Sequence, residues 1–333
     1  MKRFFIFMAL MIILAAGGSL WLRAEYHRFL ETPLALPATG YVLQVQPGTP
    51  GRALIATLEE KGFTQAGWEW KLLMRLEPMM IHAGEFALER GLRPQGLLKL
   101  LSSGAVIQYR LTLVEGWTFH QFLEALGKDE ILEQTLQPGN PGFMSQFLDS
   151  LEIADPEGWF LPETYQFTRG DSDFDILKRS HEEMKNALAQ AWDARNLDLP
   201  LDSPYELLIL ASIIEKETSL ETERERIAGV FIRRLQSGMR LQTDPTVIYG
   251  MGESYDGNIR RRDLQADTPY NTYTRFGLPP TPIAMPGRAS LMAAGQPEDG
   301  DALYFVADGN GGHTFSATLE EHQAAVKKMI GRG

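Results

Sequence analysis

The sequence predicts an α+β protein with an N-terminal transmembrane helix, a small α+β subdomain and a larger α+β domain. Three observations lead to this prediction. An uncharged apolar run lies near the N-terminus, short strand-like segments alternate with helical ones from about residue 40, and the 333 residues are enough for two domains. The expected parts are a cytoplasmic tip (1–3), a transmembrane helix (4–22), a linker (23–39), the subdomain (40–105) and the larger domain (106–333).

The overall composition is that of a globular protein, with 44% hydrophobic and 23% charged residues. The formal net charge is −11, so no basic surplus exists to neutralise a nucleic-acid backbone. The chain has no cysteine. Disulfides, thiolate catalysis and cysteine-ligated zinc are therefore excluded.

The N-terminal segment Phe4–Leu22 contains nineteen residues without a charge. At about 1.5 Å rise per residue, a helix of this length nearly spans a hydrocarbon core of about 30 Å. Lys2 and Arg3 precede the segment, which favours a cytoplasmic N-terminus, whereas Arg23 and Arg28 on the other side weaken that charge bias.

A cleaved signal peptide is the alternative for this segment, because Ala15–Ser19 contains the small residues of a cleavage site. The apolar run is longer than a usual signal core and continues through Leu22, which favours a retained anchor. In both cases most of the chain lies outside the cytoplasm. We expect a single-pass protein of the cytoplasmic (inner) membrane with a periplasmic larger domain.

The subdomain begins with a strand and ends with a helix. The predicted order is a strand, two helices, a second strand and a third helix: Tyr41–Val45, Arg52–Lys61, Trp68–Arg75, Gly84–Leu88 and Leu97–Leu101. A strand, two helices and a strand in a compact unit resemble a LysM-type glycan-binding module. The same order also occurs in many other small α+β domains.

The larger domain is predicted to contain mainly helices with a few short strands. The predicted elements are a strand at Tyr109–Val114, a helix through Leu126, helices at Phe174–Ala191 and Tyr205–Thr218, a strand at Leu303–Ala307 and a helix at Leu319–Ile330. Tyr205–Thr218 is apolar around most of its circumference, so it is expected to be a central buried helix. The next helix is predicted to start at a capping box formed by Thr222 and Glu225 and to stop at Gly238.

The end of the predicted central helix carries two carboxylates, Glu215 and Glu217. Residues two apart lie about 200° apart on a helix, so these two side chains face opposite sides. They therefore do not form the carboxylate pair that flanks the bond in a standard glycosidase. Both have apolar neighbours, and the helical wheel does not choose between them. The non-catalytic alternative is an ion pair with Lys216 or Arg224.

Several longer motifs give the chain a family resemblance. The sequence resembles the endolytic murein transglycosylases of the MltG (YceG-like) family over almost its whole length, through segments that follow one another in the same order: 157–165, 211–218, 240–250, 270–273, 277–280, 283–284, 286–287, 304–309 and 311–315. This resemblance implies cleavage of the β-1,4 bond between N-acetylmuramic acid and N-acetylglucosamine. The muramyl 6-hydroxyl attacks its own anomeric carbon and leaves a 1,6-anhydro end.

One glutamate can serve such a reaction as acid and then as base, so no nucleophilic carboxylate is needed. By motif alignment, the resemblance makes Glu215 the catalytic acid/base. Glu217 is then a supporting residue, with a helix-end salt bridge as its alternative. The remaining expected substrate-binding residues are Gln242, Asp244, Tyr249, Asn271 and Tyr273; their alternatives are an Asx turn at Asp244 and loop packing for Asn271 and Tyr273.

The resemblance also implies partners and a role. Glycan strands are the expected substrate, and penicillin-binding proteins with the cell-wall synthesis machinery are the expected partners. Internal cleavage is expected to terminate strand growth. No H-E-x-x-H spacing occurs among the six histidines, and neither a metal nor another cofactor is expected. Two rival functions stay open: a hydrolytic muramidase that uses the same acid, and a non-catalytic peptidoglycan-binding scaffold.

Overall fold

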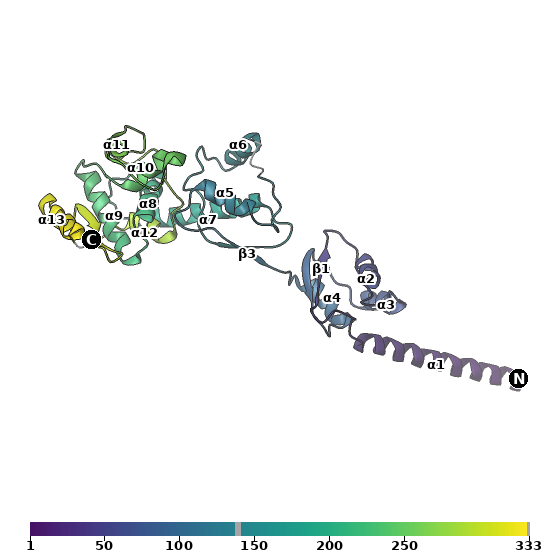
Figure 1. The fold of residues 1–333 in the computed structure, drawn as a ribbon. Coiled ribbons are helices and arrows are strands. Elements are labelled where there is room, and N and C mark those ends of the chain that lie inside the picture. Colours follow the sequence, from purple (N-terminus) through teal and green to yellow (C-terminus); the bar gives the residue numbers. More distant parts are fainter. Residues whose placement is uncertain (137–140, 332–333) are drawn as a thin grey trace. The chain divides into compact units, whose positions relative to one another are not determined.

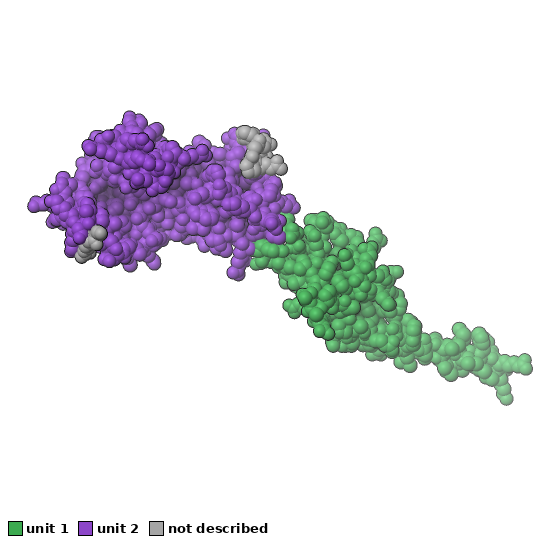
Figure 2. Space-filling view, in the orientation of Figure 1, with its two compact units in different colours: residues 1–109, 168–170 green, residues 110–167, 171–333 purple. Residues whose placement is uncertain are grey.

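The structure, a computed structural model, describes residues 1–136 and 141–331 and divides the chain into two compact units (Figure 2). Unit 1 comprises Met1–Tyr109 and Thr168–Gly170, and unit 2 comprises Arg110–Phe167 and Asp171–Gly333. Residues 137–140 and 332–333 of the predicted larger domain lie outside the described residues.

Unit 1 has the predicted order of a strand, two helices, a strand and a helix behind the N-terminal helix (Figure 1). Its elements are α1 (Lys2–Glu31), β1 (Tyr41–Val45), α2 (Gly51–Glu60), α3 (Trp68–Leu76), β2 (Gly84–Leu88) and α4 (Pro94–Ser103). β1 and β2 pair antiparallel, with Tyr41 opposite Leu88 and Val45 opposite Gly84. Leu43 and Val45 alternate with more exposed residues and point into the core, as a half-buried strand requires.

The N-terminal helix α1 continues to Glu31, nine residues beyond the predicted transmembrane segment that ends at Leu22. Residues 23–31, which were expected to belong to a linker, are therefore helical. Their apolar side chains explain the difference, because Tyr26, Phe29 and Leu30 pack against the core of unit 1. By length and composition, α1 is able to cross a membrane.

Unit 2 contains mostly helices, with two strand pairs, β3–β4 and β5–β6. Its elements are β3 (Tyr109–Thr112, whose first residue belongs to unit 1), α5 (Phe119–Gly127), α6 (Pro141–Ser150), β4 (Thr164–Phe167), α7 (Asp173–Asp193), α8 (Pro204–Glu217), α9 (Glu221–Gln236), α10 (Asp244–Met251), the 3₁₀ turn η1 (Gly252–Ser254), α11 (Arg261–Gln265), α12 (Arg288–Gly295), β5 (Tyr304–Ala307), β6 (His313–Ser316) and α13 (Leu319–Ile330). The mixture of helices and strands confirms the predicted α+β composition, and the likeness of the small unit to a LysM module stays a prediction.

Helix α8 lies in the middle of unit 2 and packs against α7, α9 and α12 (Figure 1). Every residue from Leu207 to Ile214 is buried, which confirms the central helix predicted from its apolar circumference. The next helix, α9, begins at Glu221 with Leu220 at the N-cap, so the predicted capping box at Thr222 is wrong. Ser203, by contrast, caps α8 through its side chain, which accepts a hydrogen bond from the Glu206 amide.

Candidate active site

The two glutamates at the end of α8 have different surroundings. Glu215 Oε2 accepts hydrogen bonds from the Gly287 amide at 2.9 Å and the Ser290 hydroxyl at 2.7 Å. Glu217 Oε1 accepts a hydrogen bond from the Thr243 hydroxyl. These separate partners confirm that the two side chains face different sides of the helix.

Glu215 binds the first turn of α12, where Gly287 is the N-cap residue. The first amides of a helix have no partner within the helix, and the helix dipole favours a negative charge there. Glu215 therefore acts as a capping group supplied by another helix. This contact ties α8 to α12 and gives the conspicuous Glu215 a structural role.

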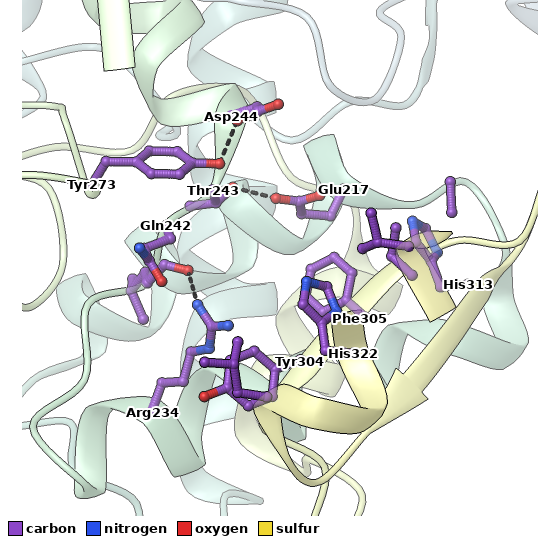
Figure 3. Close-up of a pocket in the computed structure, with 15 residues that line it drawn as sticks. Glu217, Arg234, Gln242, Thr243, Asp244, Tyr273, Tyr304, Phe305, His313 and His322 are labelled. Carbon is purple, nitrogen blue, oxygen red and sulfur yellow. Dashed lines mark hydrogen bonds between the residues drawn. The ribbon is translucent and has the colours of Figure 1, made fainter. Parts of the chain in front are cut away.

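Glu217 lines a cavity of about 510 Å³, a volume in the range of small-ligand sites (Figure 3). The walls come from the end of α8, the loop before α10, the loop after α11, strand β5 and helix α13. Its lining residues are Glu217, Arg234, Leu241, Gln242, Thr243, Asp244, Tyr273, Tyr304, Phe305, Val306, Ala307, His313, Leu319, His322 and Val326. Four predicted site residues, Glu217, Gln242, Asp244 and Tyr273, therefore share one cavity.

The carboxyl group of Glu217 is suited to hold a proton near neutral pH. The pKa of Glu217 is raised to about 7, chiefly by burial and in smaller part by the charge of Asp244. The Thr243 hydrogen bond and the charges of His313 and Arg234 act in the opposite direction. A carboxylic acid with this pKa can both donate and accept a proton at physiological pH.

Asp244 and Tyr273 form a hydrogen-bonded pair in the same cavity (Figure 3). The Tyr273 hydroxyl donates to Asp244 Oδ1 at 2.6 Å. Burial and the charges of Asp244 and Glu217 raise the pKa of Tyr273, so its hydroxyl keeps its proton. The pair therefore places one negative charge and one oriented hydroxyl near Glu217.

The loop that carries Gln242 and Thr243 is held in place by Thr272. The Gln242 amide donates to the Thr272 carbonyl at 3.2 Å, and the Thr243 amide donates to the Thr272 hydroxyl at 3.0 Å. Gln242 has a φ of +52°, in the left-handed region that non-glycine residues rarely occupy. Strained backbone that persists beside a cavity is a recurrent feature of functional sites.

Replacing Gln242 with glycine is expected to remove the side chain without disturbing this backbone, because glycine accepts a positive φ. If Gln242 binds the substrate, kcat/KM should fall about tenfold, because the loss of one neutral hydrogen bond costs about 1 kcal/mol of binding free energy. The melting temperature should stay within a few degrees. Initial rates and thermal denaturation of Gln242→Gly measure both. Gln242→Asn is the matched control, since asparagine also tolerates this conformation; full activity in Gln242→Gly would contradict a binding role.

Sequence reasoning missed Arg234, which organises the cavity. Its guanidinium donates to the carbonyls of Leu303 at 2.6 Å and Leu241 at 2.7 Å. Arg234 thereby joins α9 to β5 and to the loop before α10. A signal was present in the sequence: Arg234 follows Ile227, Val230 and Phe231 at helical spacing, which places an arginine on the buried face of α9.

His313 also lines the cavity. Its Nδ1 lies 2.7 Å from Glu223 Oε2, and its backbone amide donates to Glu223 Oε1 at 2.8 Å. These contacts fix β6 to α9 and orient the imidazole. Among the described residues, no cluster of three or more acidic or histidine side chains is arranged to hold a metal ion.

Three predicted site residues lie elsewhere: Glu215 at α12, Asn271 in a loop and Tyr249 on α10. Asn271 is buried, and its side-chain amide donates to three backbone carbonyls of residues 263–266. Its oxygen accepts from the Tyr273 amide, so it shapes the loop that carries Tyr273. The Tyr249 hydroxyl donates to Glu157 at 3.1 Å, in a second cavity.

Comparisons with known proteins agree with one another. The model of the YceG-like family matches residues 43–328. A Bacillus subtilis (strain 168) protein named endolytic murein transglycosylase is 33% identical, over 74% of this chain and 73% of its own length. A protein of the same name from Streptococcus pneumoniae serotype 2 is 26% identical, over 97% of this chain and 64% of its own length.

A solved structure is similar as well. The crystal structure of a yceG-like protein from Listeria monocytogenes matches with a TM-score of 0.54 and 30% identity, and the match covers 86% of this chain and 99% of that one.

Proposed function

Because the chain belongs to the YceG-like family, we propose that it is an endolytic murein transglycosylase, the activity for which its curated relatives are named. In this proposal it is a lyase that cuts within the glycan strands of peptidoglycan at the bond between N-acetylmuramic acid and N-acetylglucosamine. The observation that carries the proposal is Glu217, a carboxylic acid with a pKa of about 7 in a cavity of about 510 Å³.

In the proposed reaction, Glu217 acts first as an acid and then as a base. It gives its proton to the glycosidic oxygen of the leaving N-acetylglucosamine while the bond from that oxygen to the muramyl anomeric carbon breaks. It then takes the proton of the muramyl 6-hydroxyl as the oxygen bonds to the same carbon. The product ends in 1,6-anhydro-N-acetylmuramic acid, and the glutamate returns to its starting state without water being added.

The neighbouring groups fit the charges that develop in such a reaction. Positive charge appears at the anomeric carbon in an oxocarbenium-like transition state. The carboxylate of Asp244 stabilises this charge, and Tyr273 fixes the orientation of that carboxylate through its hydrogen bond. Gln242 contributes polar contacts to the N-acetyl or hydroxyl groups of the sugar.

Glu217, rather than Glu215, is therefore the acid/base in this proposal. The motif-based prediction assigns the role to Glu215, which is engaged with the amide of Gly287 and the hydroxyl of Ser290. These contacts hold Glu215 against the N-terminus of α12, whereas Glu217 lines the cavity. The Glu215 assignment stays a prediction that mutagenesis can decide.

The cellular role that we propose follows the same reasoning. Helix α1 anchors the protein in the cytoplasmic membrane with its N-terminus inside, so that unit 2 works on nascent strands in the periplasm and terminates their growth. The small βααβ unit binds glycan in the manner of a LysM module. Penicillin-binding proteins and the cell-wall synthesis machinery are the proposed partners.

Product analysis tests the reaction. Purified full-length protein is incubated with uncrosslinked glycan strands, and the new ends are identified by mass spectrometry. We expect new 1,6-anhydro ends that arise from cleavage at internal bonds of the strands. Reducing ends, heavier by one water, would instead identify a hydrolytic muramidase, and intact strands that bind the protein would identify a scaffold.

The pKa of Glu217 predicts a pH dependence. Since the acid must be protonated, turnover should fall above pH 7, about tenfold per pH unit. Folding stability should fall in a lower range, as the pH rises from about 4.5 to 7, because in that range the folded state holds this proton while the unfolded state has lost it; above pH 7 this contribution to stability is constant. Rate profiles from pH 5 to 9 measure the first effect, and thermal denaturation at each pH measures the second.

A variant at Asp244 checks that this pH limb belongs to Glu217. The charge of Asp244 raises the pKa of Glu217, so Asp244→Asn should move the falling limb to lower pH. A rate that stays constant from pH 6 to 9 in the unaltered protein would contradict the assignment of Glu217 as the acid.

A further inference from the structure

A second cavity of about 880 Å³ lies in unit 2, and the proposed reaction does not use it. It is bounded by the first turn of α5, the end of α8, helix α10 and the turn after it. Charged and apolar groups share its lining, which includes Glu157, Lys216, Ile248, Tyr249, Glu253 and Ile283. The apolar lining is provided chiefly by Pro245, Ile248 and Ile283.

The carboxylate of Glu157 is built into the wall of this cavity. Glu157 is 5% exposed, accepts the Phe119 amide at 3.1 Å and accepts the Tyr249 hydroxyl at 3.1 Å. Burial raises the pKa of Glu157 to about 7. Burying a carboxyl group is costly unless it has partners, and this one is held at the N-terminus of α5 beside a cavity large enough for a ligand.

The second cavity adjoins the cavity that holds Glu217. Lys216 lines the second cavity and Glu217 lines the first, although the two are consecutive in α8. In the same way, Asp244 lines the first cavity and Pro245 lines the second. The last turn of α8 and the first turn of α10 therefore form the boundary between the two cavities. The linings of the two cavities are therefore neighbours in the chain at both places, which puts the second cavity close to a ligand bound at Glu217.

We propose that the second cavity binds the short peptide that murein carries on its muramyl units. This inference rests on the proposed function, because it takes murein as the substrate. A muramyl unit in the first cavity would present its peptide as a side branch of the glycan. The second cavity therefore makes the protein selective for muramyl units that still bear their peptides.

The charges of the lining favour a peptide over a further stretch of glycan. A stem peptide has carboxylates, a diamino acid with a free amino group, and the methyl groups of alanine. Lys216, whose ammonium donates to the Gly116 carbonyl at 3.1 Å, is placed to attract the carboxylates. Glu253 and Glu124 line the cavity with exposed carboxylates, which can attract the free amino group of the peptide. The N-acetylated glycan has no such amino group.

The test fills the cavity and compares two substrates. Ile248 is half-buried in the wall, and Ile248→Trp reduces the space. Leu197→Trp is the matched control, because Leu197 lines a separate cavity of about 580 Å³. Full-length proteins in detergent are assayed on uncrosslinked glycan strands that carry their peptides and on strands from which an amidase has removed them, with melting temperatures measured in parallel.

We expect the unaltered protein and Leu197→Trp to cut peptide-bearing strands about tenfold or more faster than stripped strands. Ile248→Trp should lose this preference by slowing only on the peptide-bearing strands. Equal rates of the unaltered protein on both substrates would overturn the proposal. An equal loss on both substrates by a folded Ile248→Trp protein would also overturn it and would indicate that the cavity holds glycan.

Binding of the free stem peptide separates this inference from the proposed reaction. Calorimetric titration should detect binding to the unaltered protein and to Glu217→Gln, and none to Ile248→Trp. If no strand is cut but the peptide still binds in this pattern, the proposed reaction fails and the peptide site stands. If strands are cut but the peptide binds no better to the unaltered protein than to Ile248→Trp, the peptide site fails alone.

Discussion

Glu217→Gln is expected to lower turnover on glycan strands by about 10³-fold, the size of effect that a positioned general acid/base contributes. Glutamine has nearly the same shape, and its side-chain oxygen can still accept the Thr243 hydrogen bond. The folded state should therefore survive, and the melting temperature should stay the same or rise, since a buried ionisable group is removed. Initial rates and thermal denaturation of the purified full-length variant measure both quantities.

Glu215→Gln is the matched control for this prediction. Both donors, the Gly287 amide and the Ser290 hydroxyl, bind the same oxygen of Glu215, so one amide oxygen can accept both. We expect at most a several-fold loss of turnover and a small loss of stability from the missing charge at the helix N-terminus. An inactive Glu215→Gln beside an active Glu217→Gln would restore the motif-based assignment and refute ours.

Gly158→Ala is expected to destabilise unit 2 by about 3 kcal/mol. Gly158 has a φ of +84°, and an added Cβ would lie 2.5 Å from Pro282 Cβ and 2.6 Å from its Cγ. Both atoms belong to a rigid ring, so they cannot move aside as the end of a flexible side chain would. In a unit of this size, the loss corresponds to a fall of roughly 10 °C in melting temperature, measurable by calorimetry.

Gly238→Ala separates the two causes of that loss, which are the strain of an alanine at a positive φ and the clash of its Cβ with Pro282. Gly238 has a φ of +64°, but no atom lies within 4 Å of an added Cβ. This variant should cost only the conformational strain of about 1 kcal/mol. Equal losses in the two variants would contradict the proposed clash with Pro282.

The sequence predicted much of the fold because local patterns decided it. Tyr41–Val45 and Gly84–Leu88 are short segments rich in apolar residues, and both form the predicted strands. The central position of α8 followed from its apolar circumference. The linker prediction differed from the structure because the aromatic residues of 23–31 find partners in the small unit, and such tertiary packing leaves no local signal.

The candidate site was harder to predict, and α8 shows why. The helical wheel shows that Glu215 and Glu217 point to different sides of the helix, but it does not show which of them faces the cavity. An amphipathic helix reveals its outer face, whereas α8 is buried nearly all round and therefore reveals none. Tyr249 and Asn271 illustrate the same difficulty, because their motifs mark segments next to the cavity, but only the packed structure shows which side chains reach it.

The packing of α1 on unit 1 has a consequence for motion. Phe29 contacts Trp70 edge to face with ring centres 5.1 Å apart, and Tyr26 lies 6.3 Å from Trp68. If residues 4–22 lie in a bilayer, the small unit packs directly against the continuation of the membrane-spanning helix and is not joined to it through a flexible linker. The orientation of the small unit relative to the membrane plane then follows the tilt and rotation of α1 in the bilayer.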